Sequence, residues 1–236
     1  ERVWQELAKG LMAERPSRMF AALRACGALA QLLPEIEALY GVPQRADFHP
    51  EVDTGIHVMM VIDCAAARDF SLEVRYAALT HDLGKGTTPE AEWPRHIAHE
   101  LRSFELIRPL CERLRVPNAC RDLALVTARF HGVVHRAPEL RAETLLKLLQ
   151  DTDALRQPQR FEYFLQACEA DFCGRKDFDH QPFVQADVLR NGLEVVAAVD
   201  AGAVAKQCVD PAQIRDQVHL ARLAALKHWQ QKQHSS

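Results

Sequence analysis

The sequence predicts an all-α protein. Apolar residues recur at the spacing of one helix face through most of the 236 residues, whereas the alternation typical of strands is nearly absent. Apolar residues make up 48% of the chain and charged residues 26%, which is the balance of a globular protein with a hydrophobic core. We therefore expect a helical bundle with helices added at both ends.

The first two helices are expected before residue 34. In "ERVWQELAKGLMAE" one stripe carries Val3, Leu7 and Leu11, and an Arg-Pro-Ser turn should end this helix. Ser17 is expected to cap a second helix that runs to Pro34. The following "GVPQRADFHP" holds two prolines and shows no periodicity, so it marks a boundary.

Eight further helices are predicted from residue 50 onward. The last one has a clear start, with Asp210 as its N-cap, Pro211 at the first helical position and Gln213 at the capping-box position. The polar stretch "GRKDFDHQPF" reads as a loop. The predicted ranges are 51–68, 71–83, 96–115, 118–131, 140–151, 158–173, 183–200 and 211–231.

Composition limits the classes of function. A net charge of −3 and a pI near 6.4 argue against broad phosphate-driven binding of nucleic acid by the whole chain. Seven cysteines without a CxxC pair predict buried thiols rather than a disulfide framework. No apolar run approaches the 18 residues of a spanning helix, and the first residues do not form a signal peptide. We expect a cytoplasmic protein without membrane contact.

The stretch "YAALTHDLGKG" places two strong polar groups, His81 and Asp82, at the end of an apolar helical run. Ala77 and Ala78 leave space beside them, and Gly84 is expected to end the helix. The negative end of the helix dipole favours a cation at that place. Imidazole and carboxylate are good ligands for a divalent transition metal, so this pair predicts part of a metal site.

Two further ligands are expected from other helices. His57 lies in the apolar stretch "GIHVMMVID", and Asp153 follows the apolar helix "LLKLLQ". Together with His81 and Asp82 they would supply two imidazoles and two carboxylates from three helices. Four protein ligands leave positions for water on an octahedral ion.

Other polar residues are weaker candidates for substrate binding. His131 is assigned a substrate or second-metal role, Lys85 and Arg129 are candidates for a phosphate contact, and Asp82 and His131 carry the predicted chemistry. For each of them an ordinary core or surface role is the alternative. Possible additional contacts come from His99, His96 and, less strongly, His135. The remaining histidines are expected to be ordinary: His49, His180, His219, His228 and His234.

The order of these residues, H…HD…D, resembles the HD superfamily of metal-dependent phosphohydrolases. His57, His81, Asp82 and Asp153 fall on the metal positions of that superfamily. The resemblance implies an HD-domain helical bundle that binds a divalent ion and hydrolyses phosphate esters.

A closer resemblance is to the C-terminal HD portion of bacterial CCA-adding tRNA nucleotidyltransferases. It implies a neck-like segment at 1–49, an HD domain at 50–175 and a helical tail at 176–236, with 2',3'-cyclic phosphodiesterase, 2'-nucleotidase and phosphatase activities. It also implies nickel, cobalt, manganese or magnesium as the ion. The expected partners are RNA 3' ends or tRNA, 2',3'-cyclic nucleotides and a nucleotide-adding head, which this sequence lacks, so we do not expect the chain to add CCA by itself. The matching stretches are "ERVWQELAKGLMAERPSRMFAALRACGALAQLLPEI", "DTGIHVMMVIDCAA", "VRYAALTHDLGKGTTP", "EWPRHIAHELRSFELI" and "LLKLLQDTDALRQPQRFEYFLQACEADF".

The alternative function is a non-catalytic body that binds tRNA or forms a homodimer. Its discriminating feature would be a basic face, and only scattered arginines offer one, while the whole chain is acidic. The candidates are Arg113, Arg115, Arg121, Arg136 and Arg141.

Overall fold

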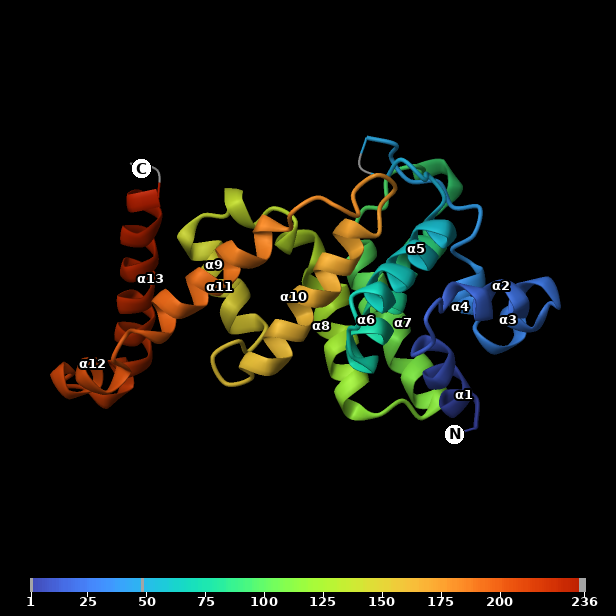
Figure 1. Ribbon diagram of the computed structural model, residues 1–236. Coiled ribbons are helices and arrows are strands. Elements are labelled where there is room, and N and C mark those ends of the chain that lie inside the picture. Colours follow the sequence, from blue (N-terminus) through green and yellow to red (C-terminus); the bar gives the residue numbers. More distant parts are fainter. Residues whose placement is uncertain (1, 48, 234–236) are drawn as a thin grey trace. The chain divides into compact units, whose positions relative to one another are not determined.

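The computed structural model describes residues 2–47 and 49–233, and it confirms the all-α prediction (Figure 1). Within the described residues no strand is formed, and the one β-bridge joins Pro43 to Asp53. His234, expected to be an ordinary histidine, lies outside the described residues.

The chain folds into two compact units. The first contains residues 1–135 and 162–183, and the second contains residues 136–161 and 184–236. Most of α10 (Pro158–Cys173) belongs to the first unit. The three-part division into neck, HD domain and tail therefore stays a prediction.

The first unit begins with four short helices, α1 (Arg2–Leu11), α2 (Ser17–Ala25), α3 (Ala28–Leu32) and α4 (Pro34–Glu37). The long second helix that we expected is interrupted at Gly27, whose φ of 74° is left-handed and breaks the helical path. Ser17 is not the expected cap. It is the first residue of α2, and its backbone N–H and hydroxyl both donate to Asp63.

The body of the first unit is a bundle of α5 (Thr54–Ala67), α6 (Leu72–Thr80), α7 (His99–Leu114) and α8 (Asn118–Val134), together with α10 (Figure 1). Asp53 and Ser71 cap α5 and α6 by accepting from backbone N–H groups. α6 packs against α5 and α8 and is buried from Val74 to Thr80. Two short 3-10 turns, η1 (Leu83–Thr87) and η2 (Glu90–Glu92), connect α6 to α7.

The buried guanidinium of Arg75 fastens the N-terminal helices to this bundle. It donates to the carbonyls of Leu11 and Ala13 at 2.9 and 3.1 Å, and to Phe70 at 2.8 Å. These carbonyls follow helix ends, where they have no helical partner. Arg75 therefore joins the end of α1 to the helix that carries the His-Asp pair.

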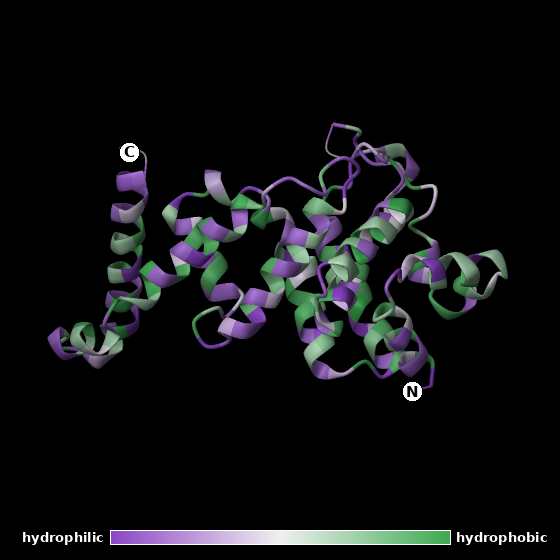
Figure 2. Ribbon diagram, in the orientation of Figure 1, coloured by the Kyte–Doolittle hydropathy of each residue, from purple (hydrophilic) through white to green (hydrophobic). Residues whose placement is uncertain are grey.

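The second unit contains η3 (Ala137–Glu139), α9 (Ala142–Asp151), α11 (Val184–Ala197), α12 (Ala201–Gln207), η4 (Pro211–Gln213) and α13 (Ile214–Gln233). Asp210 does act as a cap, but it caps η4 by accepting from Ala212 N, and α13 begins three residues later than expected. α12 was not predicted. Along α13 hydrophobic residues alternate with hydrophilic ones (Figure 2). Of the described residues of this helix, Leu226 is the one that is buried.

All seven cysteines are free thiols, and four of them are buried as predicted, whereas Cys64 and Cys208 are half-buried and Cys26 is exposed. Burial raises the pKa of Cys64 and Cys120 to about 12, so neither is a thiolate at neutral pH. None of the described helices is both long enough and apolar enough to span a bilayer.

Candidate metal centre

The His-Asp pair lies where α6 gives way to η1. His81 is the C-cap of α6 and Asp82 precedes the first residue of η1, so the two side chains leave the backbone at different angles. Gly84 does not end the helix, because α6 already stops at Thr80. Instead, a Cβ at Gly84 would collide with the carbonyl of His99 and lie 2.6 Å from Ser103 N. The glycine lets η1 touch the backbone of α7, and its N–H donates to Ser103 Oγ at 2.8 Å.

Three elements bring a buried ligand set together. His57 of α5 and His81 are 0% exposed, and Asp171 of α10 is 3% exposed. Asp171 Oδ1 lies 3.0 Å from His57 Nε2 and 3.6 Å from His81 Nε2, while Asp82 Oδ2 lies 3.2 Å from His81 Nε2. Donor atoms bound at about 2.1 Å to a single ion lie about 3.0–3.4 Å apart. The 3.0 and 3.2 Å separations fall in this range and the 3.6 Å separation slightly exceeds it. The groups that could hold a cation here are His57–His81–Asp171 and His81–Asp82–His131.

The hydrogen bonding of His81 shows which atom is the donor to a metal. Its Nδ1 lies 2.8 Å from the carbonyl of Ala78, so Nδ1 carries the proton and Nε2 keeps a lone pair. That Nε2 is buried without a hydrogen-bond partner. Burial would lower the pKa of His81, but Asp82 and Asp171 outweigh it and raise the pKa to about 10. The centre therefore calls for a positive charge at Nε2, which a proton or a metal ion can supply.

Both carboxylates have further neighbours, through the second oxygen of Asp171 and through the Asp82 oxygen that also faces His81. Asp171 Oδ2 lies 2.5 Å from His135 Nε2, and Asp82 Oδ2 lies 2.6 Å from Lys85 Nζ. Lys85 Nζ also donates to Gln44 Oε1 at 2.5 Å. Although burial opposes ionisation, Lys85 and His81 hold the pKa of Asp82 well below its usual range. Lys85, predicted to contact substrate phosphate, is thus 7% exposed and engaged with protein partners.

Beside the ligand set, Asp82 Oδ1 faces two more imidazoles. His99 Nε2 lies 3.3 Å and His131 Nε2 3.5 Å from this oxygen, and the two nitrogens are 3.3 Å apart. The Nδ1 atoms are directed at backbone carbonyls of His96 and Thr127, which leaves lone pairs on Nε2. Asp82 Oδ1 is buried without a hydrogen-bond partner. This second group can hold a second cation or take up a proton.

Glu51 was not predicted, and it lies behind His57. Glu51 Oε1 is 2.8 Å from His57 Nδ1 and 3.2 Å from His49 Nδ1. Burial opposes ionisation of Glu51, yet His49 and His57 hold its pKa well below the ordinary value. His49 was expected to be an ordinary histidine, and burial lowers its pKa to about 4.

Asp153, predicted as the fourth ligand, is not part of the cluster. α9 ends at Asp151, and Asp153 follows with a left-handed φ of 57° in the second unit. Its carboxylate pairs with Arg156 Nε at 2.6 Å and lies 3.9 Å from Arg160 Nη2. The structure places Asp171 in the position expected for Asp153. Asp171 follows Phe164 and Cys168 along the buried face of α10, so a carboxylate on an apolar stripe was the available signal.

The remaining candidates have other surroundings. Both ring nitrogens of His96 are 2.9 Å from partners, Thr88 Oγ1 and the Pro43 carbonyl, so this ring anchors a loop and is not free to bind metal. Arg129 lies exposed on α8 and does not line the cavity described below. His180 is exposed.

A cavity of about 470 Å³ opens beside the cluster. Its wall includes two candidate metal ligands, Asp82 and Asp171, and two imidazoles that can act as bases, His99 and His131. A ligand in the cavity would therefore contact both kinds of group. Pro94 and Ile97 add an apolar part, and Ile97 is 69% exposed. Four cations also line it: Arg45, Lys85, Arg95 and Arg175. A cavity with this lining suits an anionic ligand of about nucleotide size.

Two family models match the chain. Residues 54–156 match the HD domain, which covers His57, His81 and Asp82 but ends before Asp171. Residues 1–40 match the family described as "Probable RNA and SrmB- binding site of polymerase A". This match to the HD domain, a class of helical domain that carries its His-Asp pair at a metal centre, runs from the first unit into residues 136–156 of the second.

The chain is similar over almost its whole length to proteins named "Multifunctional CCA protein". The protein of Cupriavidus taiwanensis is 65% identical over 96% of this chain and 55% of its own length. Those of Burkholderia pseudomallei and Paraburkholderia phymatum are 63% and 62% identical over 96% of the chain. The chain spans about half the length of these relatives, consistent with the HD portion of a CCA protein.

Proposed function

We propose that this chain is a metal-dependent phosphohydrolase. The observation that carries the proposal is the set of lone-pair nitrogens and carboxylate oxygens that face one another in the dry interior, beside a cavity with four cations. The ion would be held by His57, His81, Asp82 and Asp171. When bound, a divalent ion such as Ni²⁺, Co²⁺, Mn²⁺ or Mg²⁺ offsets charge on a phosphoryl oxygen and lowers the pKa of a water molecule.

The chain's own residues supply the proton chemistry. During hydrolysis the oxygen of water forms a bond to phosphorus, one ester P–O bond breaks, and the leaving oxygen takes up a proton. His99 Nε2 and His131 Nε2 face the cavity with lone pairs, so the pair can accept one proton from the attacking water and return it to the leaving oxygen. Lys85 keeps Asp82 ionised and in place.

The substrates that we propose are 2',3'-cyclic nucleotides, 2'-nucleotides and phosphate esters at RNA 3' ends. The size and charge of the cavity support a nucleotide, and the relatives are named for CCA, which fits an RNA 3' end as substrate. Cytoplasmic localisation and a homodimer stay predictions.

The test is hydrolysis of bis-p-nitrophenyl phosphate and 2',3'-cyclic AMP with Ni²⁺, alongside elemental analysis. We expect His81→Ala and Asp82→Ala to lose bound metal and to lower activity by at least about 100-fold, more than the effect typical of residues outside the ligand set. The matched control is His180→Ala, since that histidine is exposed. Wild-type activity in His81→Ala would remove the centre from the chemistry.

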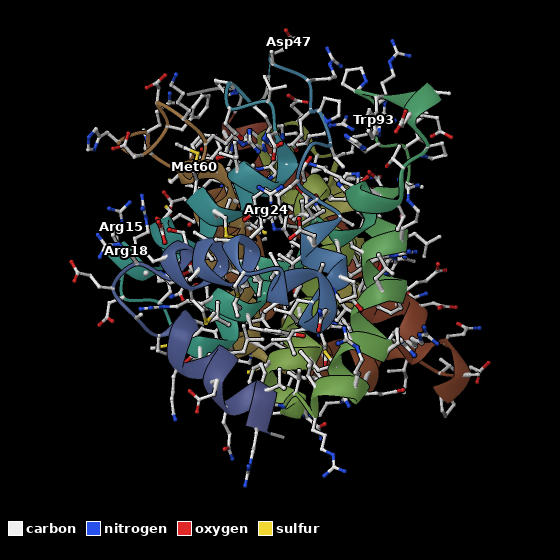
Figure 3. The ribbon with its side chains drawn as sticks, turned by 90° about the vertical axis from the view of Figure 1, so that its right-hand side faces the viewer. Arg15, Arg18, Arg24, Asp47, Met60 and Trp93 are labelled. Atoms are coloured by element: carbon white, nitrogen blue, oxygen red, sulfur yellow. The ribbon has the colours of Figure 1, made fainter. Side chains whose placement is uncertain are left out.

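A second function, RNA binding through the N-terminal helices, is favoured by the match over residues 1–40 and by exposed basic residues there. Arg15 lies in the turn between α1 and α2 and Arg18 follows this turn as the second residue of α2 (Figure 3). Phosphate contacts from this turn would make affinity depend on salt. We expect Arg18→Ala to reduce the salt dependence of tRNA binding in a filter assay, while Arg129→Ala leaves it unchanged. Affinity that does not respond to salt would contradict the proposal.

A further inference from the structure

We propose that Arg175 binds the phosphoryl oxygens of the substrate in the cavity beside the metal centre. The proposal rests on the phosphohydrolase function above and adds a substrate-binding residue to it. Arg175 lies in the stretch that the sequence predicted as a loop, and it is one helical turn beyond the ligand Asp171.

Close packing between two helices determines where Arg175 lies. α10 ends at Cys173, and a Cβ on the next residue, Gly174, would lie 2.6 Å from Val61 Cα of α5. Only a glycine allows this approach, since real side chains do not reach such distances. The chain is thereby held against the helix that carries His57. Arg175 follows directly, with its side chain 12% exposed and lining the cavity.

The guanidinium has donors that the protein does not use. Its Nη2 is 3.5 Å from His135 Nε2, at the limit for a hydrogen bond, and 3.9 Å from Asp171 Oδ2, beyond that limit. Nε is buried without a hydrogen-bond partner. Arg175 also lies over the ring of Phe172, 5.6 Å from its centroid. A buried guanidinium has five N–H donors, and unpaired ones are unfavourable unless a ligand accepts from them.

The other buried cation of the cavity is engaged in a different way. Lys85 donates to Asp82 at 2.6 Å and to Gln44 at 2.5 Å, so its ammonium group is committed to the protein. Arg45 and Arg95 line the cavity as exposed side chains. Arg175 is therefore a largely buried cation of the cavity with donors that the protein leaves unused. Its planar fork matches two phosphate oxygens, which an ammonium group does not do.

The experiment compares Arg175→Ala, Arg175→Lys and the control Arg129→Ala in the metal-loaded protein. We expect Arg175→Ala to lower kcat/KM for 2',3'-cyclic AMP by about 100-fold, the effect of removing one preorganised charge-stabilising donor. The inhibition constant of inorganic phosphate should rise at least about tenfold, since the phosphate contact is lost. Arg175→Lys should recover only part of the loss because the fork is absent. Added guanidinium ion should restore activity to Arg175→Ala and not to His81→Ala.

Two outcomes would overturn the proposal. One is wild-type affinity for inorganic phosphate in a folded, metal-loaded Arg175→Ala protein. The other is loss of bound metal together with activity, because Arg175 would then act by holding Asp171. If the wild-type protein hydrolyses no phosphate ester, the proposed function fails, yet the phosphate-binding comparison still decides the role of Arg175.

Discussion

The buried metal centre of the first unit and the charged groove of the second unit hold similar residue types under opposite conditions. In the first, Asp82 and Asp171 have side chains that are 1% and 4% exposed. In the second, a groove of about 930 Å³ between α9 and α13 contains the pair Lys147–Asp151, whose side chains are 73% and 34% exposed. Nζ of Lys147 lies 2.8 Å from the carboxylate.

The difference shows how burial changes what a charge requires. Water solvates both partners in the groove, so their attraction is weak and no further cation is needed. In the metal centre the two carboxylates are almost fully buried, so each needs nearby positive charge or hydrogen bonds. In the centre, His81 Nε2 and Asp82 Oδ1 are among the buried atoms of the described residues that have no hydrogen-bond partner. The buried carboxylates of the centre therefore call for a nearby cation, whereas the exposed Lys147–Asp151 pair does not.

The largest expected effect comes from comparing two aspartates. Asp171→Asn removes a carboxylate from the ligand set, so we expect loss of bound metal and a fall in phosphodiesterase activity of at least about 100-fold. Asp153→Asn alters a residue whose partner Arg156 has a side chain that is 83% exposed, and should leave activity and metal content at wild-type values. Activity assays and elemental analysis measure both. Equal losses in the two variants, or a loss only in Asp153→Asn, would return Asp153 to the ligand set.

Lys85→Met should have the next largest effect, on stability. Removing one partner of a buried pair leaves Asp82 uncompensated, which is expected to lower the free energy of unfolding by about 3 kcal/mol in protein treated with EDTA. A bound divalent ion supplies charge to the same carboxylate, so the loss should be smaller in metal-loaded protein. Urea unfolding with and without Ni²⁺ provides the measurement. A loss that is the same in both conditions would mean that Lys85 and the ion do not share Asp82.

The pH dependence of the metal-free protein should report His81. Its folded pKa of about 10 lies above the value of about 6.5 in an unfolded chain. The stabilisation from its protonated form is therefore fully present below about pH 6.5 and is lost as the pH rises through about 10. Unfolding measured in EDTA across that range should show a decline that His81→Ala lacks and His180→Ala keeps. If the free energy of unfolding of the wild-type protein does not change over this pH range, the proposed preference for a positive charge at His81 Nε2 is contradicted.

The smallest effect is expected in the groove. Lys147→Ala removes an exposed pair between residues four apart on α9, worth no more than about 0.5 kcal/mol. Thermal unfolding at low and at high salt measures it. A loss above about 1 kcal/mol would show that the groove is not governed by solvent screening.

The sequence predicted the helical class and part of the centre for identifiable reasons. Helical periodicity located α5, α6, α8 and α10 to within a few residues, because their buried faces are continuous. His57 and His81 interrupt such faces, so they were visible as buried polar residues. Asp153 was chosen because it follows an apolar helix, but that criterion does not say where the chain turns next. Asp171 lies within the apolar stripe of its own helix and was the better candidate by the same rule.

Residue positions that depend on contacts between helices or on an unusual backbone angle could not be predicted from helical periodicity. The sequence placed Lys85 in a loop, but in the structure it is buried. Its ammonium group contacts Gln44, which is 41 residues away in the sequence, and Asp82, which is three residues away. Neither contact could be predicted from the local sequence pattern. Arg175 stood in a polar stretch, and its position depends on Gly174 meeting α5. The interruption of the second predicted helix at Gly27 depends on the left-handed φ of this residue. The apolar pattern continues on both sides of Gly27, so it gave no sign of the interruption.

Because Gly84 has no side chain, η1 lies directly against the backbone of the first turn of α7. Asp82 precedes Gly84 by two residues, and His99 is the first residue of α7. The backbone at Gly84 approaches the backbone of α7 directly, without a glycine side chain between them. We therefore expect a displacement of α7 to move the backbone that carries Asp82 with it, because no flexible side chain separates η1 from α7.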